Sequence, residues 1–397
     1  MLLREGRGVP IRGDEVKTAR AATGIYIHVP FCVSRCTYCD FFSTVPEDDA
    51  IKAAYGARVI ALLERELGTV RSGDLVSLYL GGGSPSTMPP SFFTALGAAL
   101  RNAGIAVPAI EFTVEANPAD LSARSLDLFA AIGVNRLSLG VQAADDAVLA
   151  AMGRRATRAT LKKILPTARE KFGDLSYDII YGFGKRPRDL TAELAWLFDL
   201  AAPDHLSAYC YTRPHRRGAP PVASEDTVVE EEEAIARSLT ARRFSRYEVS
   251  NWSRRGFESV HNRLYWSWDR YIGIGAGAHG FEPRDGIRYR YPDSVAAFIR
   301  RPSPIVERLP RETLMREFVM LALRTAEGVP LDKFSKIFGI SFSELLSPVT
   351  RARFLDTGYA TLSATRLRAT RSGFSFLNTL TAALFDDIER HERVHAG

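Results

Sequence analysis

Short apolar runs rich in β-branched residues alternate along the chain with longer segments that show a helical spacing of apolar positions. This alternation predicts an α/β fold in which parallel strands are joined by right-handed helical crossovers. Six strand–helix units would form an open (β/α)₆ barrel. The predicted strands are Ile25–Val29, Leu75–Leu80, Glu111–Glu115, Arg136–Val141, Leu175–Tyr181 and His205–Tyr211. The predicted helices include Asp48–Val70, Pro90–Asn102, Ala123–Ala131, Thr157–Lys171 and Leu190–Leu200.

The pattern changes after Pro310, where three amphipathic segments precede a predicted hairpin and a final helix. Helices followed by a hairpin indicate a winged-helix-like module, a fold that elsewhere binds DNA. Residues 311–397 hold 12 basic and 10 acidic side chains, which is too even a balance for a DNA-binding wing, so we expect a lid or docking module. These elements are Glu312–Arg324, Leu331–Phe338, Phe342–Ala352, Tyr359–Leu362, Leu367–Thr370 and Phe376–Arg393.

Three regions follow from this organisation: a disordered leader over residues 1–23, a barrel with its extension over 24–305, and a mainly helical module over 306–397. The leader lacks the apolar core of a signal peptide, and no stretch approaches the ~20 apolar residues of a membrane span. The acidic run Glu230–Glu233 is interpreted as the solvated start of a helix.

The composition is that of an ordinary globular protein, with 397 residues of which 46% are hydrophobic. The net charge is +6, but the basic residues are spread along the chain, so no nucleic-acid partner is predicted. Four cysteines in this length do not form a disulfide framework, and a reducing compartment, the cytoplasm, is expected.

Three cysteines, Cys32, Cys36 and Cys39, have the spacing C-x₃-C-x₂-C. Thiolates on one short loop can bind a single 4Fe-4S cluster, and three ligands leave one iron open to a non-protein ligand. A zinc knuckle would need a fourth Cys or His nearby, and the sequence offers none. The remaining cysteine, Cys210, follows an apolar run and is predicted to be a buried core thiol.

Other candidate residues fall at the carboxyl ends of the predicted strands, where chemistry collects in this architecture. The glycine run Gly81–Gly83 follows the second strand, and backbone without side chains can approach a ligand closely. Glu115 ends the third strand and is suited to an ammonium group or ribose hydroxyls. The alternative for Glu115 is an ordinary solvated acid.

Eight motifs occur in order between about residues 24 and 380: YIHVPFCVSRCTYCDFFS, LYLGGGSPS, FTVEANP, RLSLGVQ, YDIIYG, YEVSNWSRRG, HNRLYW and IGIGAGAHG. Together they resemble the coproporphyrinogen-oxidase-like branch of the radical S-adenosylmethionine (SAM) superfamily, most closely its haem chaperone subfamily. The resemblance implies that Tyr26, Gly82 and Glu115 hold a SAM molecule bound to the cluster. In the porphyrinogen-oxidising relatives a second SAM site is lined by the positions that match Tyr38, Gly83, Ser84, Gln142, Arg154 and Asp178.

Two departures from the family pattern alter the loops of the second SAM site. The chain has the sequence YGFGKRP over Tyr181–Pro187 where the family usually continues YGLPGQ. Ala156 stands where a histidine commonly follows the glycine-arginine pair. The cluster loop itself is unchanged.

Two features separate a chaperone from an oxidase within this branch. The oxidase subfamily has a further cysteine two residues after the third cluster cysteine, and this chain has Phe41 there. The chaperone motif H-N-x-x-Y-W is present as His261–Trp266. An imidazole is a standard axial ligand of haem iron, and aromatic side chains offer flat apolar surface to a macrocycle. The alternative is a histidine that is hydrogen-bonded within the fold, and His279 is a second candidate ligand.

The resemblance therefore implies a haem chaperone that binds a 4Fe-4S cluster, SAM and haem and delivers haem to an acceptor haemoprotein, such as a respiratory one. The enzymatic alternative is oxygen-independent oxidation of coproporphyrinogen III. RNA modification would use the same cluster loop, but the chain lacks the basic footprint for RNA. Whether the chain forms a homodimer stays open.

Overall fold

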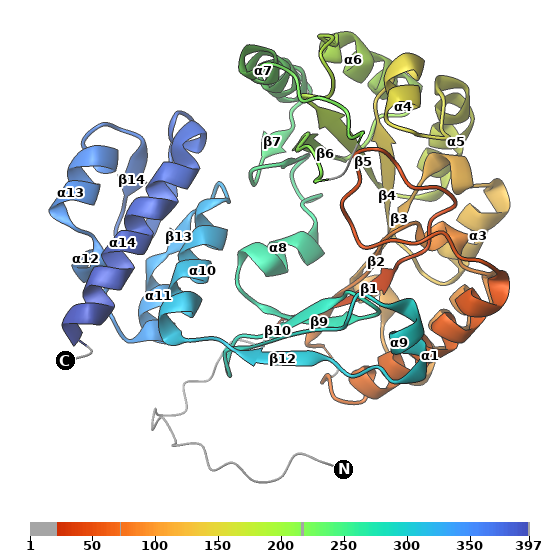
Figure 1. The fold of residues 1–397 in the computed structure, drawn as a ribbon, viewed down its shortest axis with the longest axis horizontal. Coiled ribbons are helices and arrows are strands. Elements are labelled where there is room, and N and C mark those ends of the chain that lie inside the picture. Colours follow the sequence, from red (N-terminus) through yellow and green to blue (C-terminus); the bar gives the residue numbers. More distant parts are fainter. Residues whose placement is uncertain (1–21, 72, 216–217, 396–397) are drawn as a thin grey trace.

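The computed structural model describes residues 22–71, 73–215 and 218–395. Six parallel strands form an arc with helices on its outer side, and a smaller module lies beside the arc (Figure 1). The strands are β1 (Thr23–Val29), β2 (Leu75–Gly82), β3 (Glu111–Ala116), β4 (Arg136–Gln142), β5 (Asp174–Tyr181) and β6 (His205–Cys210). The helices that follow them are α1 (Asp49–Leu67), α2 (Pro90–Asn102), α3 (Ala123–Ala131), α4 (Asp146–Ala151), α5 (Arg158–Lys171), α6 (Leu190–Leu200) and α7 (Glu225–Ala241). The predicted open (β/α)₆ barrel is confirmed, with strand ends that shift by one or two residues.

The sheet continues beyond both ends of the arc and does not close. Its order is β12-β11-β10-β9-β1-β2-β3-β4-β5-β6-β8-β7, and β9 is parallel to β1. The added strands are β7 (Ser245–Arg246), β8 (Asn251–Ser253), β9 (Arg270–Ile274), β10 (His279–Glu282), β11 (Ile287–Arg290) and β12 (Ile305–Arg308). Helix α8 (Val260–Trp266) precedes β9, and α9 (Val295–Arg300) precedes β12.

The C-terminal region contains helices and a three-stranded antiparallel sheet, as the pattern of helices followed by a hairpin predicts. Its own apolar core is separate from that of the barrel. Its elements are α10 (Arg311–Leu323), β13 (Val329–Pro330), α11 (Leu331–Phe338), α12 (Phe342–Leu345), α13 (Pro348–Thr350), β14 (Ala360–Leu362), β15 (Arg366–Ala369) and α14 (Leu377–His395).

Four sequence-based expectations need comment. The single helix over Phe342–Ala352 is wrong: α12 ends at Leu345 and α13 begins at Pro348, because proline has no N–H and restricts the residue before it. Strand β12 (Ile305–Arg308) pairs with β11 in the large sheet, across the expected boundary between residues 305 and 306. Of the predicted leader, residues 1–21 lie outside the described residues, and Thr23 is already in β1.

The interpretation of the acidic run Glu230–Glu233 as the solvated start of a helix is also wrong. Helix α7 begins at Glu225, so Glu231 lies within it, and its side chain is buried. The carboxylate accepts hydrogen bonds from the backbone N–H of Gly182 (2.6 Å) and of Arg188 (3.2 Å). Glu231 therefore anchors the loop after β5.

Among the described helices none is long and apolar enough to cross a membrane.

Candidate functional site

A cavity of about 520 Å³ opens at the carboxyl ends of the barrel strands. All three predicted cluster cysteines line it, together with eight of the nine residues predicted to hold SAM. The structure thus brings together residues from β2 to β5 and from the loops that follow β1, β2 and β4. The predicted site residues that line this cavity are Cys32, Cys36, Cys39, Tyr38, Gly82, Gly83, Ser84, Glu115, Gln142, Arg154 and Asp178.

The three cysteines lie on the loop after β1, are partly exposed and form no disulfide bond within the described residues. The loop is closed at its base by backbone hydrogen bonds from Cys32 N–H to the carbonyl of Thr44 (2.9 Å) and from Thr44 N–H to the carbonyl of Pro30 (2.7 Å). Across the described residues, no three His, Cys, Asp or Glu side chains converge closely enough for one metal ion. A four-iron cluster takes each thiolate on a different iron, so three soft sulfur donors on one loop fit such a cluster.

The glycine run packs directly against this loop. Gly82 has φ +107°, and a Cβ there would lie 2.3 Å from the ring of His28. A Cβ at Gly83 would lie 2.6 Å from the carbonyl oxygen of Phe31. Only glycine can occupy these two positions, so backbone rather than side chains faces the ligand space beside the cysteines.

Glu115 does not have the contacts of a solvated surface acid. Its carboxylate accepts hydrogen bonds from the Tyr79 hydroxyl (2.6 Å) and from the Gly82 N–H (3.0 Å). Burial raises the pKa of Glu115 to about 7, against the lowering effect of these two donors. Held between β2 and β3, the carboxylate is oriented toward the cavity and suits a cationic group.

Arg154 organises the other side of the cavity. Its guanidinium lies 3.4 Å from the Tyr38 hydroxyl and 3.7 Å from the Cys36 sulfur, and it donates to the Asn117 side chain (3.1 Å) and the Gly140 carbonyl. Its Nε is buried and has no hydrogen-bond partner in the described residues. This arginine therefore connects the cluster loop to the ends of β3 and β4.

Three more predicted residues complete this side of the cavity. Gln142 has φ +66° where the register of β4 against β5 shifts, so its backbone is held in a conformation that is uncommon for a non-glycine residue. Asp178 accepts a hydrogen bond from Ser138 (3.2 Å), and burial raises its pKa. Ser84 donates to Asp120 (3.2 Å).

Tyr26 differs from the other SAM candidates in its position, and the prediction for Cys210 is wrong. Tyr26 does not line the cavity, and its hydroxyl is 2.9 Å from Nδ1 of His28. Cys210, predicted as a buried core thiol, is instead exposed and lines the same cavity as the cluster cysteines. The prediction failed because β6 ends at Cys210, where the apolar run leaves the sheet.

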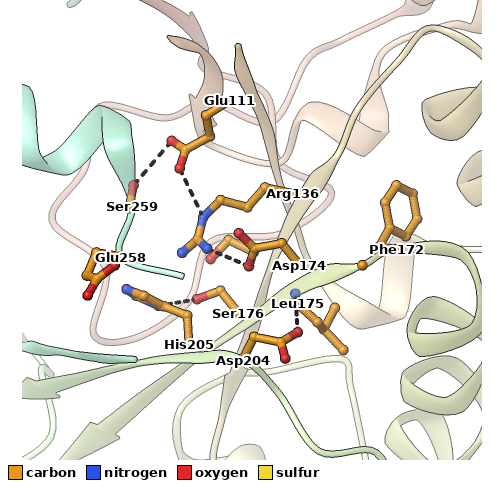
Figure 2. A network of polar contacts seen from close by, with 12 residues as sticks. Glu111, Arg136, Phe172, Asp174, Leu175, Ser176, Asp204, His205, Glu258 and Ser259 are labelled. Carbon is orange, nitrogen blue, oxygen red and sulfur yellow. Dashed lines mark hydrogen bonds and ion pairs between the residues drawn. The ribbon is translucent and has the colours of Figure 1, made fainter. Parts of the chain in front are cut away.

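A buried polar network forms the floor of the cavity (Figure 2). The Arg136 guanidinium is 2.7 Å from Asp174 and 3.9 Å from Glu111. Glu111 in turn accepts hydrogen bonds from the first backbone N–H groups of α8, at Val260 (2.7 Å) and His261 (2.9 Å). The floor therefore ties α8, which carries the H-N-x-x-Y-W motif, to the amino ends of β3, β4 and β5.

His261 is buried, and both of its ring nitrogens are occupied. Nδ1 is 2.8 Å from the Ser77 hydroxyl, and Nε2 is 2.8 Å from the Tyr265 hydroxyl. Burial lowers the pKa of His261 to about 3, so the ring is neutral. This geometry matches the alternative of a histidine that is hydrogen-bonded within the fold. Iron ligation by Nε2 would require the bond to Tyr265 to break.

Other residues of that motif, and the second histidine candidate, lie elsewhere. Trp266 lines a separate cavity of about 400 Å³ that Phe318 and Lys333 of the C-terminal region also line. Asn262 lines the barrel cavity, so α8 forms a wall between the two cavities. His279 is exposed at the start of β10 and lines neither of them.

The sequence reading missed the polar residues inside the barrel. Along β2 to β6 most residues of one alternating set are polar and face the interior, whereas most residues of the other set are apolar and buried. This period of two was the available signal, because side chains of a strand alternate between its faces. The missed lining residues include Tyr79, Arg136, Ser138, Ser176, His205, Ser207 and Tyr209.

Comparison with known proteins agrees with this architecture. Residues 26–195 match the Radical SAM superfamily model, and residues 309–376 match the HemN C-terminal domain model. The heme chaperone HemW of Lactococcus lactis is 32% identical over 335 residues, covering 81% of this chain and 86% of that protein. The heme chaperone HemW of Bacillus subtilis is 31% identical, covering 82% and 89%. The structure of coproporphyrinogen III oxidase (HemN) from Escherichia coli superposes with a TM-score of 0.77 over 92% of this chain at 18% identity, a likeness of fold.

Proposed function

Because this chain belongs to the HemW family of radical SAM proteins, we propose that it is a haem chaperone, which binds haem and passes it to an acceptor haemoprotein. The observation that carries this proposal is the similarity to HemW proteins over more than four-fifths of the chain. Phe41 supports it, since it occupies the position of the additional cysteine expected of the oxidase subfamily.

We assign the cluster to Cys32, Cys36 and Cys39. The fit rests on three cysteine side chains that lie at one cavity wall outside any disulfide bond, next to glycines whose backbone leaves room for a ligand. A 4Fe-4S cluster supplies one-electron chemistry when bound. The chain's contribution is to hold it at the cavity mouth and to keep the loop closed at its base.

SAM would lie between the glycine run and the ends of β3 to β5. The Glu115 carboxylate faces the same space as the backbone of Gly82, which suits the ammonium or the ribose of SAM. Arg154 and Asp178 place opposite charges on the far wall, where a second SAM would lie if one binds. Tyr26 supports the site through His28 rather than from the cavity wall.

The haem contact of the motif on α8 remains a prediction. His261 could serve as a ligand only after giving up the Tyr265 hydroxyl. Trp266 of the same motif is half-buried and lines the second cavity, where its ring is accessible to a macrocycle. An acceptor such as a respiratory haemoprotein and a cytoplasmic location belong to the same proposal.

The proposal is tested with anaerobically purified full-length protein. We expect haem to remain bound after desalting, with a Soret band, and we expect coproporphyrinogen III to be left unconverted in the presence of SAM and a reductant. The His261→Ala variant should show a shifted or weaker Soret band if the imidazole binds iron. SAM-dependent conversion of coproporphyrinogen III by the parent protein would assign the chain to the oxidases instead. Failure of the parent to retain haem would reject the chaperone function.

A further inference from the structure

The cluster loop exposes large apolar side chains at the mouth of the barrel cavity. Phe41 is 69% exposed and Val33 is 50% exposed, and both line the cavity. Val45, on the same loop, is 50% exposed but does not line the cavity. An aromatic ring left in water beside a cavity is unfavourable for the protein alone, so a partly apolar ligand is expected to cover it.

Four cationic side chains lie at the same end of the barrel. Arg35, between Val33 and Phe41 in the sequence, lines the cavity and forms no ion pair with any described residue. The loop after β5 adds Lys185 and Arg186, both exposed. The loop after β6 adds Arg213, which is also exposed.

The acids at this rim do not cancel these charges. Asp40 lines the mouth and is exposed, and Asp120 is already paired with Arg155. The cavity mouth therefore combines the exposed apolar side chains of Val33 and Phe41 with an excess of cationic side chains. A ligand that fits both features has a broad apolar face and more than one negative charge.

We propose that haem docks on the lip of this cavity, formed by Val33, Arg35 and Phe41, with its macrocycle against the two apolar side chains and its propionates toward the cations. This inference rests on the proposed chaperone function, and it places the cargo beside the cluster loop rather than on the motif of α8. Flat aromatic contact is the arrangement that a porphyrin face offers to a phenylalanine ring. Charge-assisted contacts from arginine suit carboxylates such as propionates.

Other occupants of the lip make different predictions. If the lip served SAM, removal of the Phe41 ring would weaken SAM binding as well as haem binding. If it held the cluster loop in shape, the same change would lower iron content. Haem docking predicts an effect on haem alone.

The test compares Phe41→Ala with the matched control Val45→Ala, in the full-length reconstituted protein titrated anaerobically with ferric haem. We expect Phe41→Ala to bind haem at least tenfold more weakly and Val45→Ala to bind within twofold of the parent. Iron and sulfide content and SAM affinity should be unchanged in both variants. Arg35→Glu should also weaken haem binding, and by less at high salt, because the contribution of an exposed charge is screened.

The outcomes separate this inference from the function on which it rests. Equal haem affinity of Phe41→Ala and parent would overturn the docking site while leaving the chaperone function in place. Parallel loss of SAM or iron in Phe41→Ala would overturn it as well, in favour of a role in the cofactor site. A parent protein that binds no haem would overturn both.

Discussion

A buried carboxyl at the junction between the barrel and the C-terminal region allows a quantitative prediction. Glu248 is fully buried, and its Oε2 accepts a hydrogen bond from the Ser250 N–H (3.1 Å). Its Oε1 is among the buried atoms with no hydrogen-bond partner in the described residues. The neighbouring Val249 N–H donates to the carbonyl of Arg324 (2.9 Å), which connects this segment to α10.

Burial raises the pKa of Glu248 from its ordinary value of 4.5 to about 7. The folded protein therefore keeps this proton to a higher pH than the unfolded chain does. As pH rises from 4.5 to 7, the unfolded state ionises first, and the free energy of unfolding falls. Each pKa unit corresponds to 1.36 kcal/mol, so the loss is about 3 kcal/mol, and it is complete above pH 7.

Replacement by glutamine removes the ionisation and keeps the shape of the side chain. We expect Glu248→Gln to be about 3 kcal/mol more stable than the parent at pH 8, and we expect this difference to shrink toward zero at pH 5. Urea unfolding followed by tryptophan fluorescence at several pH values measures it. The control is Glu307→Gln on the exposed strand β12, which should leave stability unchanged at every pH. A difference of the same size at pH 5 and pH 8 would refute the reasoning.

Three further predictions concern the site and its floor. Cys36→Ala should abolish the cluster while Cys210→Ala retains it, as read by iron content and EPR; full iron in Cys36→Ala would contradict the assignment. Tyr79→Phe removes a donor that orients Glu115, so SAM affinity measured by anaerobic calorimetry should fall about tenfold with iron content unchanged. Arg136→Met leaves the partly buried acids Glu111 and Asp174 without their cation and should lower the free energy of unfolding by about 3–5 kcal/mol, whereas a change below about 1 kcal/mol would contradict a stabilising role of Arg136.

The fold could be predicted from local patterns because a parallel sheet under helices leaves an unmistakable period in the sequence. The strands β1 to β6 and helices such as α2 and α3 have the predicted bounds within one or two residues. The strands that extend the sheet were missed because they are short: β7 and β8 contain two and three residues, and β9 to β12 contain four or five. Their pairing is set by tertiary contacts that no short window contains.

The site could be predicted less completely than the fold. Motifs located the cysteines, the glycines and Glu115, all at strand ends on one side of the barrel. They did not reveal that Tyr79 orients Glu115 or that Arg136 holds the floor, because those contacts join residues 36 and 38 positions apart. The exposure of Phe41 and Cys210 could not be predicted from the motifs either, because it depends on how the loops are placed at the barrel mouth.

The position of His261 determines how a haem-binding experiment on the α8 motif should be read. Its ring stacks on Tyr79 with centroids 4.9 Å apart, and Tyr79 donates to Glu115, so the motif touches the support of the proposed SAM site. A His261→Ala variant would remove that stacking and the hydrogen bond to Ser77. It would also leave a void in α8, the helix that separates the barrel cavity from the second cavity. Loss of haem in this variant is therefore diagnostic of iron ligation only if SAM affinity stays at the parental value. If SAM and haem binding fall together, His261 supports the cavity wall, and the iron ligand lies elsewhere.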